Sequence, residues 1–126
     1  MKYIDWQNSN CFRAMTGYDV REFNDLLPYF EDAHDEYFRR YYLNGKPRSG
    51  LRTYTIYACS PLPCHAERLA FILSYLKLKP QQKHHADTFS MTQKQCNEFA
   101  HGLNKILQQA LKLAEEDAAE NNVSLV

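Results

Sequence analysis

Apolar residues in the first third of the chain recur at the spacing of one helix face. They are Phe23, Leu26, Leu27 and Phe30. Asp19 and Glu22 precede them at the spacing of a capping box, so we expect a helix to begin at Asp19. Pro28 interrupts the pattern because proline removes an amide and crowds the preceding helical turn. We therefore expect a kink or break at Pro28 and a second helical stretch over about residues 29–42.

The helical pattern stops at residues 44–63, which read NGKPRSGLRTYTIYACSPLP. Glycines and prolines punctuate this segment, and the β-favouring residues 53–57 predict a short strand or an extended arm. The arm and the residues before it carry five cations: Arg39, Arg40, Lys46, Arg48 and Arg52. A basic arm can lie along phosphates or enter a minor groove. A plain solvated loop is the alternative interpretation.

Helical periodicity returns after Pro63. Four apolar residues then mark a central core helix: Leu69, Ile72, Leu73 and Leu76. Pro80 ends that helix, and a short helix follows up to Phe89. Thr92 and Gln95 again have capping-box spacing, so we expect a new helix to begin at Thr92 after a very tight turn. Two helices joined this closely cross at a large angle, which predicts an all-α helical bundle containing a helix-turn-helix.

The last helix divides into two faces. One face is apolar and carries Cys96, Phe99, Leu103, Ile106 and Leu107. The other carries Gln93, Lys94, Asn97, His101 and Lys105. Gln and Asn can pair with adenine, Lys can reach guanine or phosphate, and a helix fits the major groove. The alternative is an ordinary amphipathic helix with a solvated polar face.

The charge distribution changes the picture that the overall composition gives. Hydrophobic residues make up 44% and charged residues 24%, as in a folded globular protein, and the formal net charge is zero. Residues 1–38 carry three basic against eight acidic residues, a net charge of −5. Residues 39–105 carry eleven basic against three acidic residues, a net charge of +8. Residues 106–126 carry one basic against four acidic residues, a net charge of −3. A basic middle segment points to a polyanionic partner, although a solvated basic face is the commoner cause.

The remaining composition argues for a cytoplasmic chain without a metal. The longest apolar stretch, residues 69–76, is far shorter than the roughly 20 residues of a membrane span, and no signal-peptide pattern opens the chain. We expect four free thiols: Cys11, Cys59, Cys64 and Cys96. A zinc site built from Cys59, Cys64, His84 and His85 is the alternative, but its cysteine spacing is marginal and no glycine flanks it.

Three blocks of the sequence together resemble one protein family. Residues 12–30 resemble the opening of bacterial insertion-sequence transposases of the DDE superfamily. That match lies at Thr16, Gly17, Glu22, Phe23, Leu26, Leu27 and Pro28. Residues 67–80 are similar to the family's core helix, and residues 90–107 to its helix-turn-helix. The latter match lies at Met91, Thr92, Gln93, Gln95, Asn97, His101 and Leu103.

The resemblance implies that the chain recognises the terminal inverted repeats of a mobile element in double-stranded DNA. In the family, a separate domain holds an acidic triad that cuts and joins strands. We expect no such domain here, because the clustered carboxylates of residues 115–120 sit on one local helix. The chain departs from the family where aliphatic residues and a turn glycine are usual. Those positions hold His84, His85, Thr88 and Ser90.

The sequence thus predicts a helical region over residues 1–43, a basic arm over 44–63, and a core helix with a helix-turn-helix over 64–120. Residues 121–126 form a tail of the same single domain. We expect base contacts from Gln93, Lys94, Asn97 and His101. We expect phosphate contacts from Lys83, Lys105 and the basic segment from Arg39 to Arg52. No cofactor and no catalytic activity are expected. A homodimer is an open alternative, with a seam at Ile106, Leu107, Ala110, Leu111 and Ala114. A small enzyme built on His84, His85 or the cysteines is the remaining one.

Overall fold

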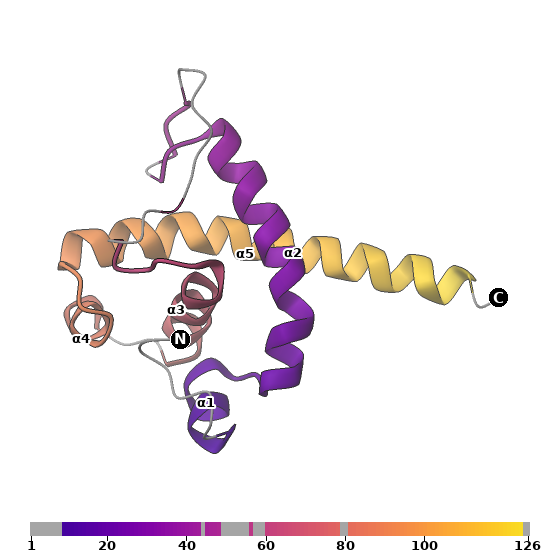
Figure 1. The fold of residues 1–126 in the computed structure, drawn as a ribbon, viewed down its shortest axis with the longest axis horizontal. Coiled ribbons are helices and arrows are strands. Elements are labelled where there is room, and N and C mark those ends of the chain that lie inside the picture. Colours follow the sequence, from indigo (N-terminus) through magenta and orange to yellow (C-terminus); the bar gives the residue numbers. More distant parts are fainter. Residues whose placement is uncertain (1–8, 44, 49–55, 57–59, 79–80, 125–126) are drawn as a thin grey trace.

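The computed structural model describes residues 9–43, 45–48, 56, 60–78 and 81–124, and this part of the chain is almost entirely helical. The helices are α1 (Ser9–Thr16), α2 (Val20–Arg40), α3 (His65–Leu78), α4 (Gln82–Thr88) and α5 (Gln93–Ser124). In Figure 1, α2 crosses the middle of the long α5, while α3 and α4 are seen nearly end-on beside the first half of α5. The prediction of an all-α bundle is confirmed.

Phenylalanines dominate the core, where α2, α3 and α5 pack on one another and α1 and α4 close its ends. Six of them are fully buried: Phe12, Phe23, Phe30, Phe38, Phe71 and Phe89. Complete burial of such a side chain contributes about 1.5–3 kcal/mol, so this set is a major part of the driving force for folding. Among the described residues, no helix is both long and apolar enough to cross a membrane.

Helix α2 begins as predicted but does not break. The Asp19 carboxylate accepts from the Glu22 amide at 2.8 Å, and the Glu22 carboxylate accepts from the Asp19 amide at 3.3 Å. The predicted break at Pro28 is wrong, because one helix runs from Val20 to Arg40. Pro28 is exposed, as is Asn24, whose carbonyl loses its amide partner and can turn to water instead. Packing of the buried faces on both sides of Pro28 then outweighs the local cost.

Helix α1 was not predicted. Its eight residues bury only Phe12 and Thr16, which is too little to create a visible periodicity. The Thr16 hydroxyl donates to the Phe12 carbonyl at 2.9 Å, inside the helix. Gly17 follows with φ 79°, and its amide donates to the Arg13 carbonyl at 2.8 Å. Glycine adopts this left-handed conformation at little cost, so Gly17 ends the helix cleanly.

A hairpin follows α2. The predicted strand at residues 53–57 lies outside the described residues except for Ile56, which has no regular structure. The described residues 41–43 and 45–48, which we name the basic hairpin, form a reversal with one isolated bridge among them, between Tyr41 and Pro47. The Tyr42 amide donates to the Lys46 carbonyl at 2.9 Å, and the Arg48 amide to the Arg40 carbonyl at 2.8 Å.

Candidate nucleic-acid interface

A very tight turn joins α4 to α5. The Met91 amide donates to the Ala86 carbonyl at 2.9 Å and the Ser90 amide to the Asp87 carbonyl at 3.2 Å, which is the bonding of a Schellman motif. Ser90 has φ 55°, a left-handed conformation that glycine usually supplies at this place. Ser90 stands where the transposases that the sequence resembles usually have a turn glycine, and the structure has the left-handed turn geometry with serine.

The start of α5 is capped as predicted. The Thr92 hydroxyl accepts from the Gln95 amide at 3.1 Å, and the Gln95 side-chain oxygen accepts from the Thr92 amide at 3.0 Å. This reciprocal pair satisfies two donors that a helix start leaves without intrahelical partners. Helix α5 therefore has a fixed first turn, and in Figure 1 it runs at a large angle to α4.

Aromatic side chains hold α4 and α5 on α3. The Phe71 ring of α3 lies 5.1 Å from the Phe89 ring and 6.1 Å from the Phe99 ring, measured between centroids. His85 completes the cluster, 4.6 Å from Phe71, and its Nε2 donates to the Phe71 carbonyl at 3.2 Å. Burial lowers the pKa of His85, which favours its neutral form. His85 thus occupies the place of an aliphatic core residue, while His84 and Thr88 are exposed.

The two faces of α5 divide as expected. The five residues of its predicted apolar face are buried, each at most 6% exposed. The five residues of the opposite face are all exposed, and we name them the polar face of α5: Gln93, Lys94, Asn97, His101 and Lys105. Lys83 is exposed on the neighbouring α4. The fold therefore leaves these polar and basic side chains accessible along the first turns of α5, with the half-buried Glu98 at their border.

The basic hairpin lies against this helix. A Cβ atom placed on Gly102 would lie 2.7 Å from Leu43 Cδ1 and 3.0 Å from the Leu43 carbonyl oxygen. A Cβ atom placed on Gly45 would lie 3.7 Å from Lys105 Nζ. Gly102 therefore lets the hairpin approach closely, and Lys105 sits at the boundary between the hairpin and the polar face. Sequence reasoning did not find this contact, because nothing local links residue 43 to residue 102.

The cations in and before the basic hairpin differ in their exposure and in the groups they contact. Arg39 and Arg40 both pair with Glu36, at 2.7 and 2.9 Å, in exposed positions where such pairs contribute little. Lys46 is exposed. Arg48 is half-buried, with Nη2 donating to the Tyr41 carbonyl at 3.3 Å. Arg52 lies outside the described residues.

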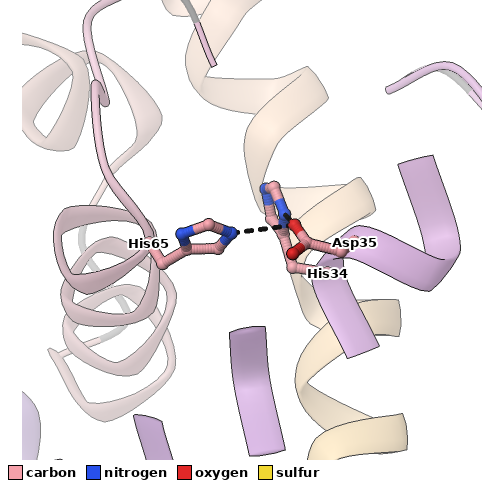
Figure 2. Close-up of side chains that lie close together, drawn as sticks. All are labelled: His34, Asp35 and His65. Carbon is pink, nitrogen blue, oxygen red and sulfur yellow. Dashed lines mark hydrogen bonds and ion pairs between the residues drawn. The ribbon is translucent and has the colours of Figure 1, made fainter. Parts of the chain in front are cut away.

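A second polar cluster joins α2 to α3 (Figure 2). His34 Nδ1 lies 3.1 Å and His65 Nε2 lies 2.9 Å from the same Asp35 oxygen. Arg68 Nη1 lies 2.9 Å from His34 Nε2. Because a guanidinium can only donate, His34 Nε2 must accept, and its Nδ1 carries the proton that is donated to Asp35. Burial of His34 lowers its pKa to about 4, so this ring is neutral.

In the described part of the chain, one group of side chains could hold a metal ion, with ligand atoms within 4.8 Å of one another: His34, Asp35 and His65. The Arg68 bond argues against a metal there, because it leaves a proton on the nitrogen that would have to bind the ion. The described residues do not form the alternative zinc site. His85 Nε2 donates to the Phe71 carbonyl, Cys64 is exposed, and Cys59 lies outside the described residues.

Two other expectations concern the second half of α5. Ile106, Leu107 and Ala110 are covered by this chain's own core, so the dimer seam expected there is wrong for these three residues. Leu111 and Ala114 are half-buried. Glu115 and Glu116 are exposed, and Asp117 accepts from the Tyr29 hydroxyl of α2. These carboxylates form a solvated helix end in which one member ties α5 to α2.

Comparison of the chain with protein-family models, with curated proteins and with solved structures finds no match. The resemblance to insertion-sequence transposases stays a prediction from the three sequence blocks. The geometry itself defines a class: a helical bundle in which two helices joined by a tight turn present one exposed polar helix face beside a basic hairpin.

Proposed function

We propose that this chain is a sequence-specific DNA-binding module without enzymatic activity, and that the first three turns of α5 enter the major groove. The observation that carries the proposal is the capped start of α5 behind a left-handed turn, with its polar face exposed and its apolar face buried. A groove-reading helix needs both properties, since the core must fix its orientation while base-reading groups remain accessible.

The basic residues around α5 support DNA as the partner. Lys83 is exposed on α4, which precedes α5 in the chain, and Lys105 of α5 lies beside the basic hairpin. Cations near a reading helix can contact the phosphates that border a groove. The exposed pairs of Arg39 and Arg40 with Glu36 are weak enough to open when a phosphate approaches.

The resemblance to insertion-sequence transposases extends the proposal to a biological site. By that analogy the chain reads the terminal inverted repeats of a mobile element in the bacterial cytoplasm, while strand cleavage belongs to a separate catalytic domain. The carboxylates at the end of α5 do not supply such chemistry, because two metal ions require acidic groups that converge from several elements.

Selection of bound fragments from a random duplex library, followed by fluorescence anisotropy on the winning sequence, tests the proposal. Asn97→Ala should weaken binding about tenfold and relax the preference at one or two base pairs. Lys94→Ala should weaken binding and lower the slope of log K against log salt by about 0.9. Lys112→Ala is the matched control, since Lys112 is exposed on the same side of α5 about 27 Å further along.

Two experimental outcomes would contradict the proposed DNA binding. A library that yields no preferred sequence, or binding that is equal in the Asn97, Lys94 and Lys112 variants, would overturn the proposal. Circular dichroism and thermal melting of each variant must match the parent protein, so that a lost affinity reports a lost contact.

A further inference from the structure

A cavity of about 550 Å³ lies between the basic hairpin and α5. This volume is in the range typical of sites for small organic groups. Aromatic rings, two guanidinium groups and two polar side chains of α5 line much of it. They include Phe38, Tyr42, Phe99, Arg48, Arg68, Gln95 and Glu98. The proposed major-groove contacts use none of these side chains.

One wall of the cavity is a fixed cation among aromatic rings. Arg68 is only 2% exposed, and its guanidinium carbon lies 5.4 Å from the Phe99 ring centroid and 5.6 Å from that of Phe38. Its Nε donates to the Leu62 carbonyl at 3.1 Å, and its Nη1 donates to His34. These bonds and ring contacts hold the guanidinium in one orientation, so a fixed positive charge lies behind the aromatic lining of the cavity.

The opposite wall is accessible. The Arg48 guanidinium carbon lies 4.4 Å above the Tyr42 ring centroid, and Tyr42 remains 40% exposed. Tyr42 and its neighbour Tyr41 are the exposed aromatic side chains in the described part of the chain. Exposed tyrosine next to arginine is the usual platform on which proteins stack single-stranded bases.

From this geometry we propose that the cavity binds one unpaired nucleotide of a DNA strand, beside the duplex that α5 reads. The inference rests on the proposed function for the identity of the polymer. A base held in a duplex is stacked on both sides and cannot enter such a cavity, so the nucleotide must be unpaired. Arg48 lines the cavity and Lys46 is exposed two residues before it, so we assign contacts with the phosphate of this nucleotide to these two cations.

The polar lining predicts a preference among bases. Glu98 can only accept hydrogen bonds when ionised, so it selects bases that carry an exocyclic amino group. Adenine, cytosine and guanine have that group, whereas thymine lacks it. The Glu98 carboxylate also repels phosphate, which favours entry of the base rather than the backbone.

The test compares the selected duplex with the same duplex carrying unpaired nucleotides, as a five-nucleotide extension at either end or as a bulge. Fluorescence anisotropy should give about tenfold tighter binding for at least one unpaired probe than for the blunt duplex. Tyr42→Ala should abolish this gain, while Tyr42→Phe should keep it because the ring remains. Replacing the unpaired bases by thymine should reduce the gain, and Glu98→Gln should remove that discrimination.

The outcomes separate this inference from the proposed function. If every unpaired probe binds like the blunt duplex, the cavity proposal fails and groove reading stands. If single-stranded DNA binds through Tyr42 but no duplex does, groove reading fails and the cavity proposal stands. A 2-aminopurine base in the extension gives an independent readout, because stacking on the cavity wall quenches its fluorescence. Unchanged fluorescence at saturating protein would overturn the cavity proposal even if the affinity differed.

Discussion

Ser90, in the turn before α5, has a left-handed backbone conformation that is strained for a residue other than glycine. Ser90 has φ 55°, and a residue with a Cβ atom in this region costs about 1–2 kcal/mol relative to glycine. We expect Ser90→Gly to stabilise the protein by about 1 kcal/mol and raise the melting temperature by about 4 °C. Thermal denaturation followed by circular dichroism measures this. Ser90→Ala is the matched control and should give no gain, since alanine keeps the Cβ atom; an equal gain in both variants would contradict the explanation.

A buried histidine makes stability depend on pH. The pKa of His34 is about 4 in the folded chain, below its ordinary value of 6.5, so the unfolded chain binds more protons between these values. Stability is therefore complete above pH 6.5 and falls as the pH drops toward 4, by roughly 3 kcal/mol in total. Asp35, His65 and Arg68 face this ring, and the lowered pKa of Asp35 adds a loss in the same direction at still lower pH.

Urea denaturation at pH 7, 6, 5 and 4 measures this dependence. His34→Gln keeps an oxygen that can accept from Arg68 but removes the titration, so its stability should change less over that range. His84→Gln is the control at an exposed position and should retain the full dependence of the parent protein. The lowered pKa of His85 leaves a residual dependence in all three proteins. A His34→Gln curve parallel to that of the parent would contradict the assignment.

At the scale of elements, Gly102 decides how closely the basic hairpin approaches α5. Alanine at this position would place its Cβ 3.0 Å from the Leu43 carbonyl oxygen and 2.7 Å from Leu43 Cδ1. Such overpacking costs about 1–3 kcal/mol, against a gain of at most about 1 kcal/mol in helix propensity. We expect Gly102→Ala to destabilise the protein by about 1 kcal/mol in chemical denaturation.

A double-mutant cycle with Leu43→Ala checks the cause. Leu43→Ala removes the nearer of the two clashing atoms, so Gly102→Ala should cost less in that background than in the parent protein. Additive effects of the two substitutions would show that the helix and the hairpin do not meet at this point.

Helix starts could be predicted from the sequence, because the residues that cap a helix lie close together along the chain. The Asp19–Glu22 and Thr92–Gln95 pairs lie within one helical turn, so their spacing alone identified two helix starts. The continuity of α2 through Pro28 could not be predicted, because it depends on packing against helices distant in sequence. The same holds for the dimer seam: an apolar stripe at Ile106 and Ala110 looks identical whether a second copy or α2 covers it.

The candidate site was predictable only in part, for the same reason. Amphipathic spacing is enough to identify the polar face of α5. The hairpin contact, the cavity and the His34–Asp35–His65 cluster each join residues at least thirty positions apart. The spacing of apolar residues within one helix does not predict contacts between residues so far apart in the sequence. A local signal did exist for Tyr42 in the cavity lining, since the sequence from Arg39 to Tyr42 places two cations directly before two tyrosines, and only the cations entered the prediction.

At the scale of the whole molecule, charge is separated along α5. This helix has 32 residues and is about 48 Å long, with the polar face at one end and exposed carboxylates at the other. Glu115 lies about 32 Å along the axis from Lys94, or roughly three Debye lengths at 0.1 M salt, and about 15 Å from Lys105, or roughly one and a half Debye lengths. The field of the acidic end is therefore screened from the first turn of the polar face and strongly reduced at Lys105, although its carboxylates help to bring the formal net charge of the chain to zero.

Neutralising the acidic end tests this separation. We expect Glu115→Gln combined with Glu116→Gln to leave the DNA affinity unchanged within about twofold at 0.1 M salt, because their field is screened before it reaches Lys94 and is strongly reduced at Lys105. At 0.01 M salt the Debye length grows to about 30 Å, so the same variant should bind measurably tighter than the parent protein. Lys105→Ala should weaken binding at both salt concentrations, since Lys105 adjoins the proposed interface. A large effect of the double variant at 0.1 M salt would mean that the end of α5 itself lies near the DNA, and would require a different docking orientation.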